Sequence, residues 1–315
     1  MRKGTVINTR LDLSNSYQQK TFDELCDEFM KRLSVQGLSP QTIKTYGYHI
    51  KYFKAFLGEN VPCQSITDET LIDYVVYLQN THEIKTITIE TYLHNLSPII
   101  KYGIKRRYIS TDVKIPSMRY QHETKEIYTQ EELNALLAPP KDNDFITLRT
   151  YTMIWTLSST AIRARELREL KVGNVNLVER QIIVNQTKNK KPRVIPISAA
   201  LFDVLQKYME IRGGEADKYL FPSIYDDILA MSSLQKQIKD YANSRGVKKT
   251  SLHLFRHTFI TNAVNSGVSP LILQRITGHS TMKQLSNYYN ARVSDIAQVI
   301  DDITPKNNSR KKQFK

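Results

Sequence analysis

The sequence predicts a mainly α-helical protein of two domains, with a small antiparallel β-sheet confined to the second domain. Apolar residues recur at helical spacing through most of the chain, behind clear helix-start signals. Alternation typical of strands is limited to three short runs between residues 175 and 196. The chain has 315 residues, which is enough for two ordinary domains.

The first domain is expected at residues 21–105 as a compact bundle of four short helices. The pattern Thr21-x-x-Glu24 is a capping box that opens the first helix. Ser39-Pro40 predicts an N-cap followed by a first-turn proline, and Gly58 ends that second helix. Two further apolar stripes predict helices at about 68–79 and 88–102.

The second domain is expected at residues 125–303. A second capping box, Thr129-x-x-Glu132, opens it, and a mostly apolar helix follows at about 145–157. Three short runs then predict a small antiparallel sheet with a basic turn at 187–191, and helical patterns resume after residue 199. The predicted strands are Val175–Leu177, Arg180–Asn185 and Arg193–Pro196.

Three segments outside these domains are polar or basic. Residues 1–20 are predicted to be a flexible arm, and residues 304–315 a basic tail. Residues 106–124 are predicted to be a linker whose basic side chains cross a phosphate backbone. A solvated loop without that role is the alternative for the linker.

The charge balance indicates an anionic partner. The formal net charge is +14 and the isoelectric point is near 9.5. This favours nucleic acid over an acidic membrane surface or a charge that serves solubility alone. Cys26 and Cys63 cannot form a disulfide framework, and we find neither a signal peptide nor a membrane-spanning run. A cytoplasmic, nucleoid-associated protein with no membrane partner is expected.

Four stretches carry an ordered set of arginine, lysine, histidine and tyrosine side chains, which suits attack by a phenol on a DNA phosphate. They are Thr160-Ala-Ile-Arg-Ala-Arg-Glu-Leu167, Thr187-Lys-Asn-Lys-Lys-Pro-Arg-Val-Ile-Pro196, His253-Leu-Phe-Arg-His257 and Gly278-His279 with Tyr288 nine residues later. The set resembles the tyrosine recombinase (phage integrase) family over about residues 21–303. The resemblance implies an N-terminal helical SAM-like core-binding domain and a tyrosine-recombinase catalytic domain.

The resemblance also assigns roles to the basic residues. Arg163 and Arg256 match the two arginines that clamp the phosphate, a geometry suited to the guanidinium fork. Lys188 matches the general acid for the 5′ leaving oxygen, with Lys190 and Lys191 as neighbouring competitors. His253 is assigned to proton transfer or phosphate contact, and His279 to a further phosphate contact.

Tyr288 is the nucleophile that the resemblance selects, through its interval from His279. Tyr289 stays an open alternative. We expect neighbouring cations to favour the phenolate form of the nucleophile.

Two further residues are expected to support the site. Glu166 lies three residues after Arg163 and can orient it, although this spacing alone indicates an ordinary surface ion pair. His257 is expected to point away from the phosphate as a buried, hydrogen-bonded structural histidine. Ala161 replaces the family's glycine and would be strained at positive φ.

We expect neither a cofactor nor a metal, because the histidines and acids offer no ligand quartet at usable spacing. Two arginines and a lysine would neutralise the charge that metal ions neutralise elsewhere.

The set therefore predicts a site-specific DNA recombinase that forms a 3′-phosphotyrosyl intermediate on double-stranded DNA with a specific core site. Integration or excision of a mobile element is the preferred role, and Xer-like chromosome or plasmid dimer resolution is the alternative. A topoisomerase IB-like relaxing enzyme and a non-catalytic DNA-binding accessory protein are the rival hypotheses. The apolar face of residues 294–303 predicts docking onto a neighbouring protomer in a homotetramer, with packing on its own domain as the alternative. An accessory DNA-bending or directionality factor is a further expected partner.

Overall fold

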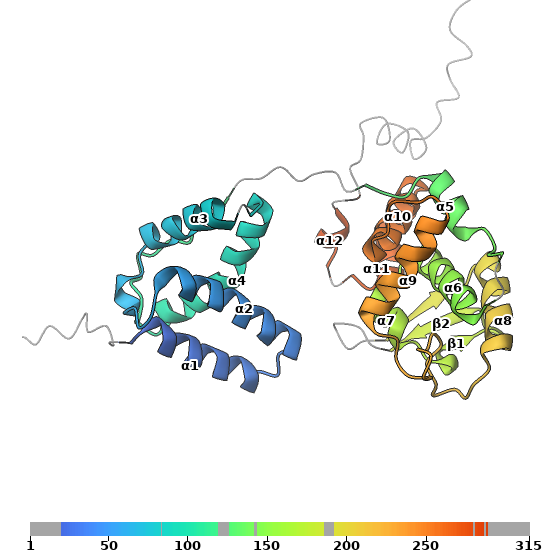
Figure 1. The fold of residues 1–315 in the computed structure, drawn as a ribbon, viewed down its shortest axis with the longest axis horizontal. Coiled ribbons are helices and arrows are strands. Elements are labelled where there is room, and N and C mark those ends of the chain that lie inside the picture. Colours follow the sequence, from blue (N-terminus) through green and yellow to red (C-terminus); the bar gives the residue numbers. More distant parts are fainter. Residues whose placement is uncertain are drawn as a thin grey trace, which may run out of the picture. The chain divides into compact units, whose positions relative to one another are not determined.

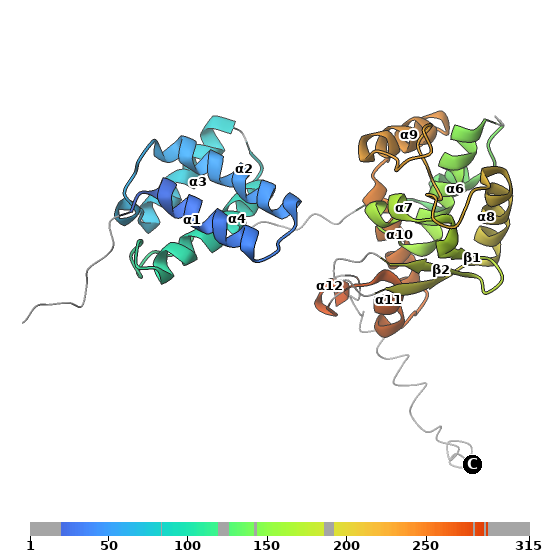
Figure 2. The same ribbon diagram turned by 90° about the horizontal axis from the view of Figure 1, so that it is seen from below.

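The computed structural model divides into two compact units, Met1–Glu123 and Thr124–Lys315 (Figures 1 and 2). The predicted arm before residue 20, the docking segment at 294–303 and the tail at 304–315 lie outside the described residues. The structure describes residues 20–82, 84–118, 126–141, 144–185, 192–279, 281–286 and 288.

The first unit is helical, and its caps are those that the sequence predicted. The Thr21 hydroxyl accepts a hydrogen bond from the Glu24 amide while the Glu24 carboxylate accepts one from the Thr21 amide. Ser39 caps the second helix, and Gly58 ends it with φ at 89°. The helices are α1 (Phe22–Val35), α2 (Pro40–Leu57), α3 (Asp68–His82) and α4 (Thr86–Lys105), with a 3-10 turn η2 at Cys63–Ser65.

The core of the first unit is aromatic. Phe53 of α2 lies edge-to-face against Phe22 of α1 and Tyr74 of α3, with ring centroids 5.1 and 4.8 Å apart. This core continues beyond α4, because Tyr108 and Ile109 are fully buried in it. These two residues lie in the segment that the sequence analysis assigned to the linker, whose boundaries stay a prediction.

Glu28 joins the two ends of the first unit. Its carboxylate accepts hydrogen bonds from the hydroxyls of Tyr102 and Tyr108 at 2.6 and 3.0 Å, and it pairs with Lys20 at 2.9 Å and Arg106 at 3.1 Å. These bonds, first of all those from Tyr102 and Lys20, lower the pKa of the Glu28 carboxyl to about 2. α1 is thereby tied to α4 and to the chain that follows it.

We expect Glu28→Gln to destabilise the first unit at neutral pH by about 1–3 kcal/mol, a value discounted because the side chain is partly solvated. Since the folded carboxyl has a lowered pKa, its contribution is complete above the unfolded pKa and is lost as pH falls toward 2. Urea unfolding should therefore show a gap between wild type and variant at pH 7 that narrows as pH falls below the unfolded pKa and closes only near pH 2. The exposed Glu59→Gln is the matched control. A gap independent of pH would contradict the assignment.

The second unit confirms the predicted small sheet among helices. β1 (Val175–Asn176), β2 (Gln181–Val184) and β3 (Arg193–Pro196) form an antiparallel sheet in that order, with Val184 paired to Arg193. Thr129 and Glu132 form the predicted capping box. The helices are α5 (Gln130–Leu137), α6 (Phe145–Thr160), α7 (Ala164–Glu169), α8 (Ala199–Arg212), α9 (Met231–Ser244), α10 (Leu252–Asn265), α11 (Pro270–Thr277) and α12 (Lys283–Ser286), with a 3-10 turn η3 at Val172–Asn174.

Helix α6 lies at the centre of this unit, and its position determines where the residues after its C-terminal end lie. It packs against α5, α8, α9 and α10, and residues 149–154 along it are buried on every side. A helix that is surrounded in this way has little freedom to shift. The residues directly after α6 are therefore held firmly. Helix α6 lies beside α10 in the second unit (Figures 1 and 2).

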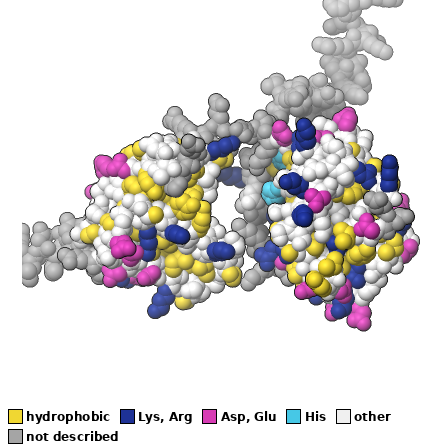
Figure 3. All heavy atoms as spheres, in the orientation of Figure 1, with side chains coloured by type: hydrophobic (Ala, Val, Ile, Leu, Met, Phe, Trp, Pro, Cys, Tyr) yellow, Lys and Arg dark blue, Asp and Glu magenta, His cyan; other side chains and the backbone are white. Residues whose placement is uncertain are grey.

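Lysine and arginine side chains are spread over the visible faces of both units with acidic residues between them, and histidine side chains reach the surface of the second unit (Figure 3). Within the described part of the chain, no helix combines the length and the apolar character needed to cross a bilayer.

Candidate active site

Arg163 is held at the start of α7 by hydrogen bonds from its backbone amide and from its guanidinium group. Its backbone amide and its Nη1 atom donate to the two oxygens of Glu166, each at 2.9 Å. Its Nη2 atom donates to the Gly278 carbonyl at 3.2 Å. The pair with Glu166 is a site contact rather than an ordinary surface pair, because the Glu166 side chain is only 4% exposed.

Arg193 is a site residue to which the sequence analysis gave no role. From β3 it forks onto Glu166, with Nη1 to Oε1 at 2.9 Å and Nη2 to Oε2 at 2.7 Å, and its Nε donates to the Ile276 carbonyl at 2.9 Å. A Cβ atom on Gly278 would meet the Arg193 Cδ at 3.1 Å, so the close approach needs glycine there. Arg193 thus joins the sheet to α7 and to the end of α11. Its place in the Lys188-x-x-x-x-Arg-x-x-Pro196 spacing was the available signal.

Arg256 is buried on α10 and is anchored by backbone carbonyls. Its Nη1 donates to the Ala161 carbonyl at 2.5 Å, and its Nη2 donates to the Thr277 carbonyl at 2.8 Å. Ala161 does adopt the left-handed conformation, with φ at 51°, where glycine costs less. The strained turn after α6 therefore supplies an anchor for a site arginine, as strained residues often do.

His279 is fixed in one tautomer by its neighbours. Since a guanidinium has no acceptor, the Nη2 of Arg256 must donate to the His279 Nε2, 3.1 Å away. The ring proton is then on Nδ1, which lies 2.8 Å from the Thr277 hydroxyl oxygen. Burial, and then the charges of Arg256 and Arg163, lower the pKa of His279 to about 4.

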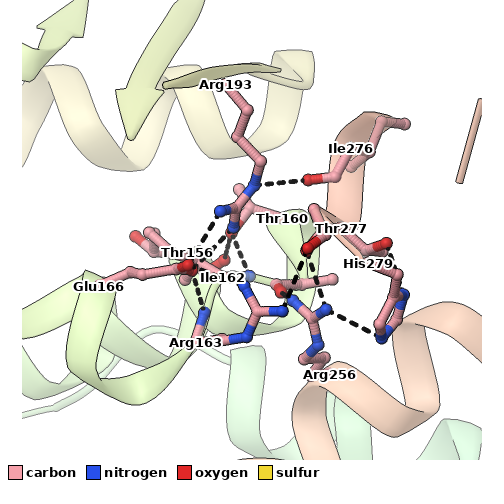
Figure 4. A network of polar contacts seen from close by, with 12 residues as sticks. Thr156, Thr160, Ile162, Arg163, Glu166, Arg193, Arg256, Ile276, Thr277 and His279 are labelled. Carbon is pink, nitrogen blue, oxygen red and sulfur yellow. Dashed lines mark hydrogen bonds and ion pairs between the residues drawn. The ribbon is translucent and has the colours of Figure 1, made fainter. Parts of the chain in front are cut away.

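This network contains three guanidinium groups and a single carboxylate: Arg163 and Arg193 bond to Glu166, and Arg256 lies on the side of Arg163 away from Glu166 (Figure 4). Burial alone would raise the pKa of Glu166, but hydrogen bonds from Arg193 and Arg163 outweigh it and lower that pKa. Burial, followed by repulsion from Arg163 and Arg193, lowers the pKa of Arg256 to about 10. The excess positive charge in a desolvated place favours the binding of an anion.

We expect Arg193→Met to lower the free energy of unfolding by about 3 kcal/mol, because it leaves a buried carboxylate with half of its partners. The double variant Arg193→Met/Glu166→Gln should lose less than the sum of the two single variants, since it removes both members of the pair. Urea unfolding of the four proteins measures both quantities. Additive losses, or a single-variant loss below about 1 kcal/mol, would contradict a coupled buried pair.

Tyr288 and Arg256 line the same cavity, which has a volume of about 520 Å³. The cavity is lined by residues that include His253, Arg256, His257, His279 and Tyr288. His253 is exposed on α10, one turn before the buried Arg256, so the two residues share a cavity but differ in access. The structure therefore brings together most of the residues that the sequence singled out.

Two expectations about Tyr288 and its surroundings are wrong in this structure. Burial raises the pKa of the Tyr288 phenol, and the opposing effect of the Arg256 charge is smaller, so the phenolate is not favoured. His257 does not point away from the reacting groups, because its Nδ1 lies 2.9 Å from the Tyr288 hydroxyl. The tyrosine is held as a protonated, hydrogen-bonded phenol.

Lys188, the proposed general acid, lies outside the described residues, as do Lys190, Lys191 and Tyr289. Their roles stay predictions. On either side of this segment, Val184 of β2 pairs with Arg193 of β3.

Comparison with known proteins agrees with both units. Residues 126–294 match the phage integrase family, and residues 21–116 match the phage integrase SAM-like domain. The tyrosine recombinase XerD of Staphylococcus aureus is 24% identical over 90% of this chain and 99% of its own length. XerD of Pseudomonas aeruginosa is 25% identical over 86% of this chain and 95% of its own.

Solved structures show the same fold. The Tn1549 transposon integrase, determined with a circular intermediate DNA, aligns with a TM-score of 0.73 at 19% identity, over 90% of this chain and all of that chain. A lambda integrase dimer bound to a core site aligns with a TM-score of 0.65 at 18% identity, over 84% of this chain and 97% of that chain.

Proposed function

Since the chain belongs to the phage integrase family of tyrosine-type site-specific DNA recombinases, we propose that it cuts and rejoins double-stranded DNA at a specific core site through Tyr288. The proposed biological role is the integration or excision of a mobile element. The proposed place of action is the nucleoid DNA of the cytoplasm.

One observation carries this proposal: Tyr288, Arg256, His279 and His253 line one cavity, and Arg256 belongs to a cluster with more guanidinium groups than carboxylates. A phosphodiester in that cavity would meet a nucleophile and the cations that stabilise the additional negative charge of the pentavalent state.

The chemistry follows from the residue types. Arg163 and Arg256 hold the non-bridging oxygens, and the Tyr288 oxygen attacks phosphorus. The 5′ oxygen leaves with a proton, for which Lys188 is the proposed donor. The resulting 3′-phosphotyrosyl bond conserves the energy of the broken bond, so the 5′-hydroxyl of another strand reseals the DNA without ATP.

The proposed assembly and the proposed biological role are supported by observations other than the cavity. A homotetramer linked through residues 294–303, with an accessory DNA-bending or directionality factor, is the proposed working form. The likeness to the Tn1549 transposon integrase supports the mobile-element role. The XerD relatives, matched over nearly their whole length, support chromosome or plasmid dimer resolution as the alternative.

Covalent capture tests the proposal. Cells that express the protein are lysed in denaturant, the protein is purified with its attached DNA, and the DNA is sequenced while the modified peptide is identified by mass spectrometry. A phosphonucleotide on Tyr288 with DNA from the ends of a mobile element is the expected result. A single chromosomal or plasmid site indicates the Xer-like role, and unselective sites indicate a relaxing enzyme. DNA bound without any covalent link would indicate an accessory protein and overturn the proposal.

A further inference from the structure

The Tyr288 hydroxyl is held by His257, for which the sequence predicted only a structural role. It lies 2.9 Å from the His257 Nδ1 atom, and the two rings are 5.0 Å apart at an angle of 59°. The Tyr288 amide donates to the Leu285 carbonyl at 2.9 Å, and the ring packs on a small cluster formed by Ile260, Leu273 and Leu285. The phenol is thereby oriented from its backbone, its ring and its oxygen.

We propose that His257 accepts the phenolic proton of Tyr288 when Tyr288 attacks the phosphate, and returns it when the strand is resealed. The inference rests on the proposed function. It places proton transfer from the nucleophile on His257, whereas the resemblance assigns proton transfer or phosphate contact to His253.

The step balances without a further reactant. With its proton on Nε2, the neutral His257 presents the lone pair of Nδ1 to the Tyr288 O–H. As the bond from the Tyr288 oxygen to phosphorus forms, the phenolic proton moves to Nδ1 and the bond from phosphorus to the 5′ oxygen breaks. The 5′ oxygen takes its proton from the general acid. Resealing reverses each transfer, and the imidazolium protonates the departing phenol.

The site has a physical need for such an acceptor. An unperturbed phenol has a pKa near 10, so only about one molecule in a thousand is a phenolate at pH 7. Burial raises the pKa of Tyr288 further. An imidazole hydrogen-bonded to the phenol removes the need for a preformed phenolate, and general base catalysis of this kind contributes about 10²–10⁴-fold.

The spacing on α10 allows His253 and His257 to divide the work. They are four residues apart and therefore lie on one face of the helix, and both line the cavity. The contact with the Tyr288 hydroxyl belongs to His257, whereas His253 is exposed at the start of α10. Phosphate contact by His253 is compatible with proton transfer by His257.

Several other ionisable groups border the cavity and bear on any pH dependence. From the segment before α5 comes Glu126, from the loop before α10 comes Lys249, from α10 itself come His253 and Arg256, and after α11 comes His279. Because all of them remain in a His257 variant, the difference between the pH profiles of wild type and variant isolates the contribution of His257.

The test is the single-turnover rate of covalent adduct formation on a nicked duplex that carries the captured core site. We expect both His257→Ala and His257→Asn to be slowed about 10²-fold. Asparagine keeps a hydrogen-bond acceptor near the position of Nδ1 but cannot take the proton. The wild-type rate should rise with pH and then level off as the imidazole becomes neutral, whereas the His257→Asn rate should rise across the whole range with the phenolate.

Two outcomes would overturn the inference. A His257→Ala rate equal to that of wild type would exclude any role, and a His257→Asn protein with the wild-type rate and pH profile would reduce the role to positioning. Gel-shift binding of the intact site and the melting temperature check that each variant is folded. Wild-type protein that binds the site but forms no adduct would instead refute the proposed function.

A second substrate separates the two proton transfers. A bridging sulfur in place of the 5′ oxygen leaves as a thiolate, which needs no proton. We expect this substrate to restore a Lys188→Ala protein but not a His257→Ala protein. Restoration of His257→Ala would place His257 at the leaving group and overturn the assignment.

Discussion

A Tyr288→Phe protein is expected to form no covalent adduct with DNA, a loss of at least about 10⁴-fold, while it binds the core site as tightly as wild type. The substitution removes one oxygen atom, which is the proposed nucleophile. The phenyl ring keeps its packing on the cluster of Ile260, Leu273 and Leu285, so the fold should not change. Nicked DNA incubated in EDTA and run on a denaturing gel measures the adduct.

Tyr289→Phe is the matched control, because it makes the same change one residue later and Tyr289 was left open as the nucleophile. We expect this variant to retain adduct formation. An adduct formed by Tyr288→Phe together with a loss in Tyr289→Phe would move the nucleophile to Tyr289. Retention by both single variants would refute the phosphotyrosyl assignment at these positions.

An Arg256→Ala protein is expected to lose about 10³-fold or more in the rate of adduct formation, comparable to the loss of a phosphate-clamping arginine in other phosphoryl-transfer sites. The guanidinium is buried and is fixed by the Ala161 and Thr277 carbonyls, so it is already oriented before DNA binds. Single-turnover rates on the nicked substrate measure the loss.

Melting temperatures distinguish a direct loss of adduct formation from a loss caused by misfolding. Repulsion from Arg163 and Arg193 adds to burial in lowering the pKa of Arg256, so its charge is unfavourable in the DNA-free fold. We therefore expect Arg256→Met to melt close to the wild-type temperature although its activity is lost. Arg256→Lys, which keeps the charge without the fork, should recover only a small part of the rate. A rate loss that follows the melting temperature would indicate a structural role instead.

The fold was predictable to the extent that local chemistry specifies it. Capping boxes at Thr21 and Thr129 and the proline start after Ser39 are signals within four residues, and the structure forms each of them. The alternation of Gln181–Val184 and Arg193–Pro196 likewise identified the strands of the sheet. Such signals depend on hydrogen bonds and side-chain directions inside one element, which a sequence contains directly.

The candidate site was only partly predictable for the opposite reason. The sequence could order Arg163, Arg256, His279 and Tyr288 along the chain, but the partner of each side chain comes from another element. Arg193 looked like a strand residue with a basic side chain, and only the fold brings its guanidinium onto Glu166 from 27 residues away. Ala161 departed from the family's glycine, and only the backbone shows that it still takes the left-handed conformation.

The sequence by itself determined the family, the helical class with its small sheet, and the residue types that act on a phosphate, because these follow from local patterns and ordered spacing. Only the tertiary structure decided the charge state and the partners of those residues. Burial raises the pKa of Tyr288 and lowers that of His279, and His257 lies at the nucleophile's oxygen rather than away from it. Desolvation and contacts between distant segments are properties of the packed chain, so no reading of single positions supplies them.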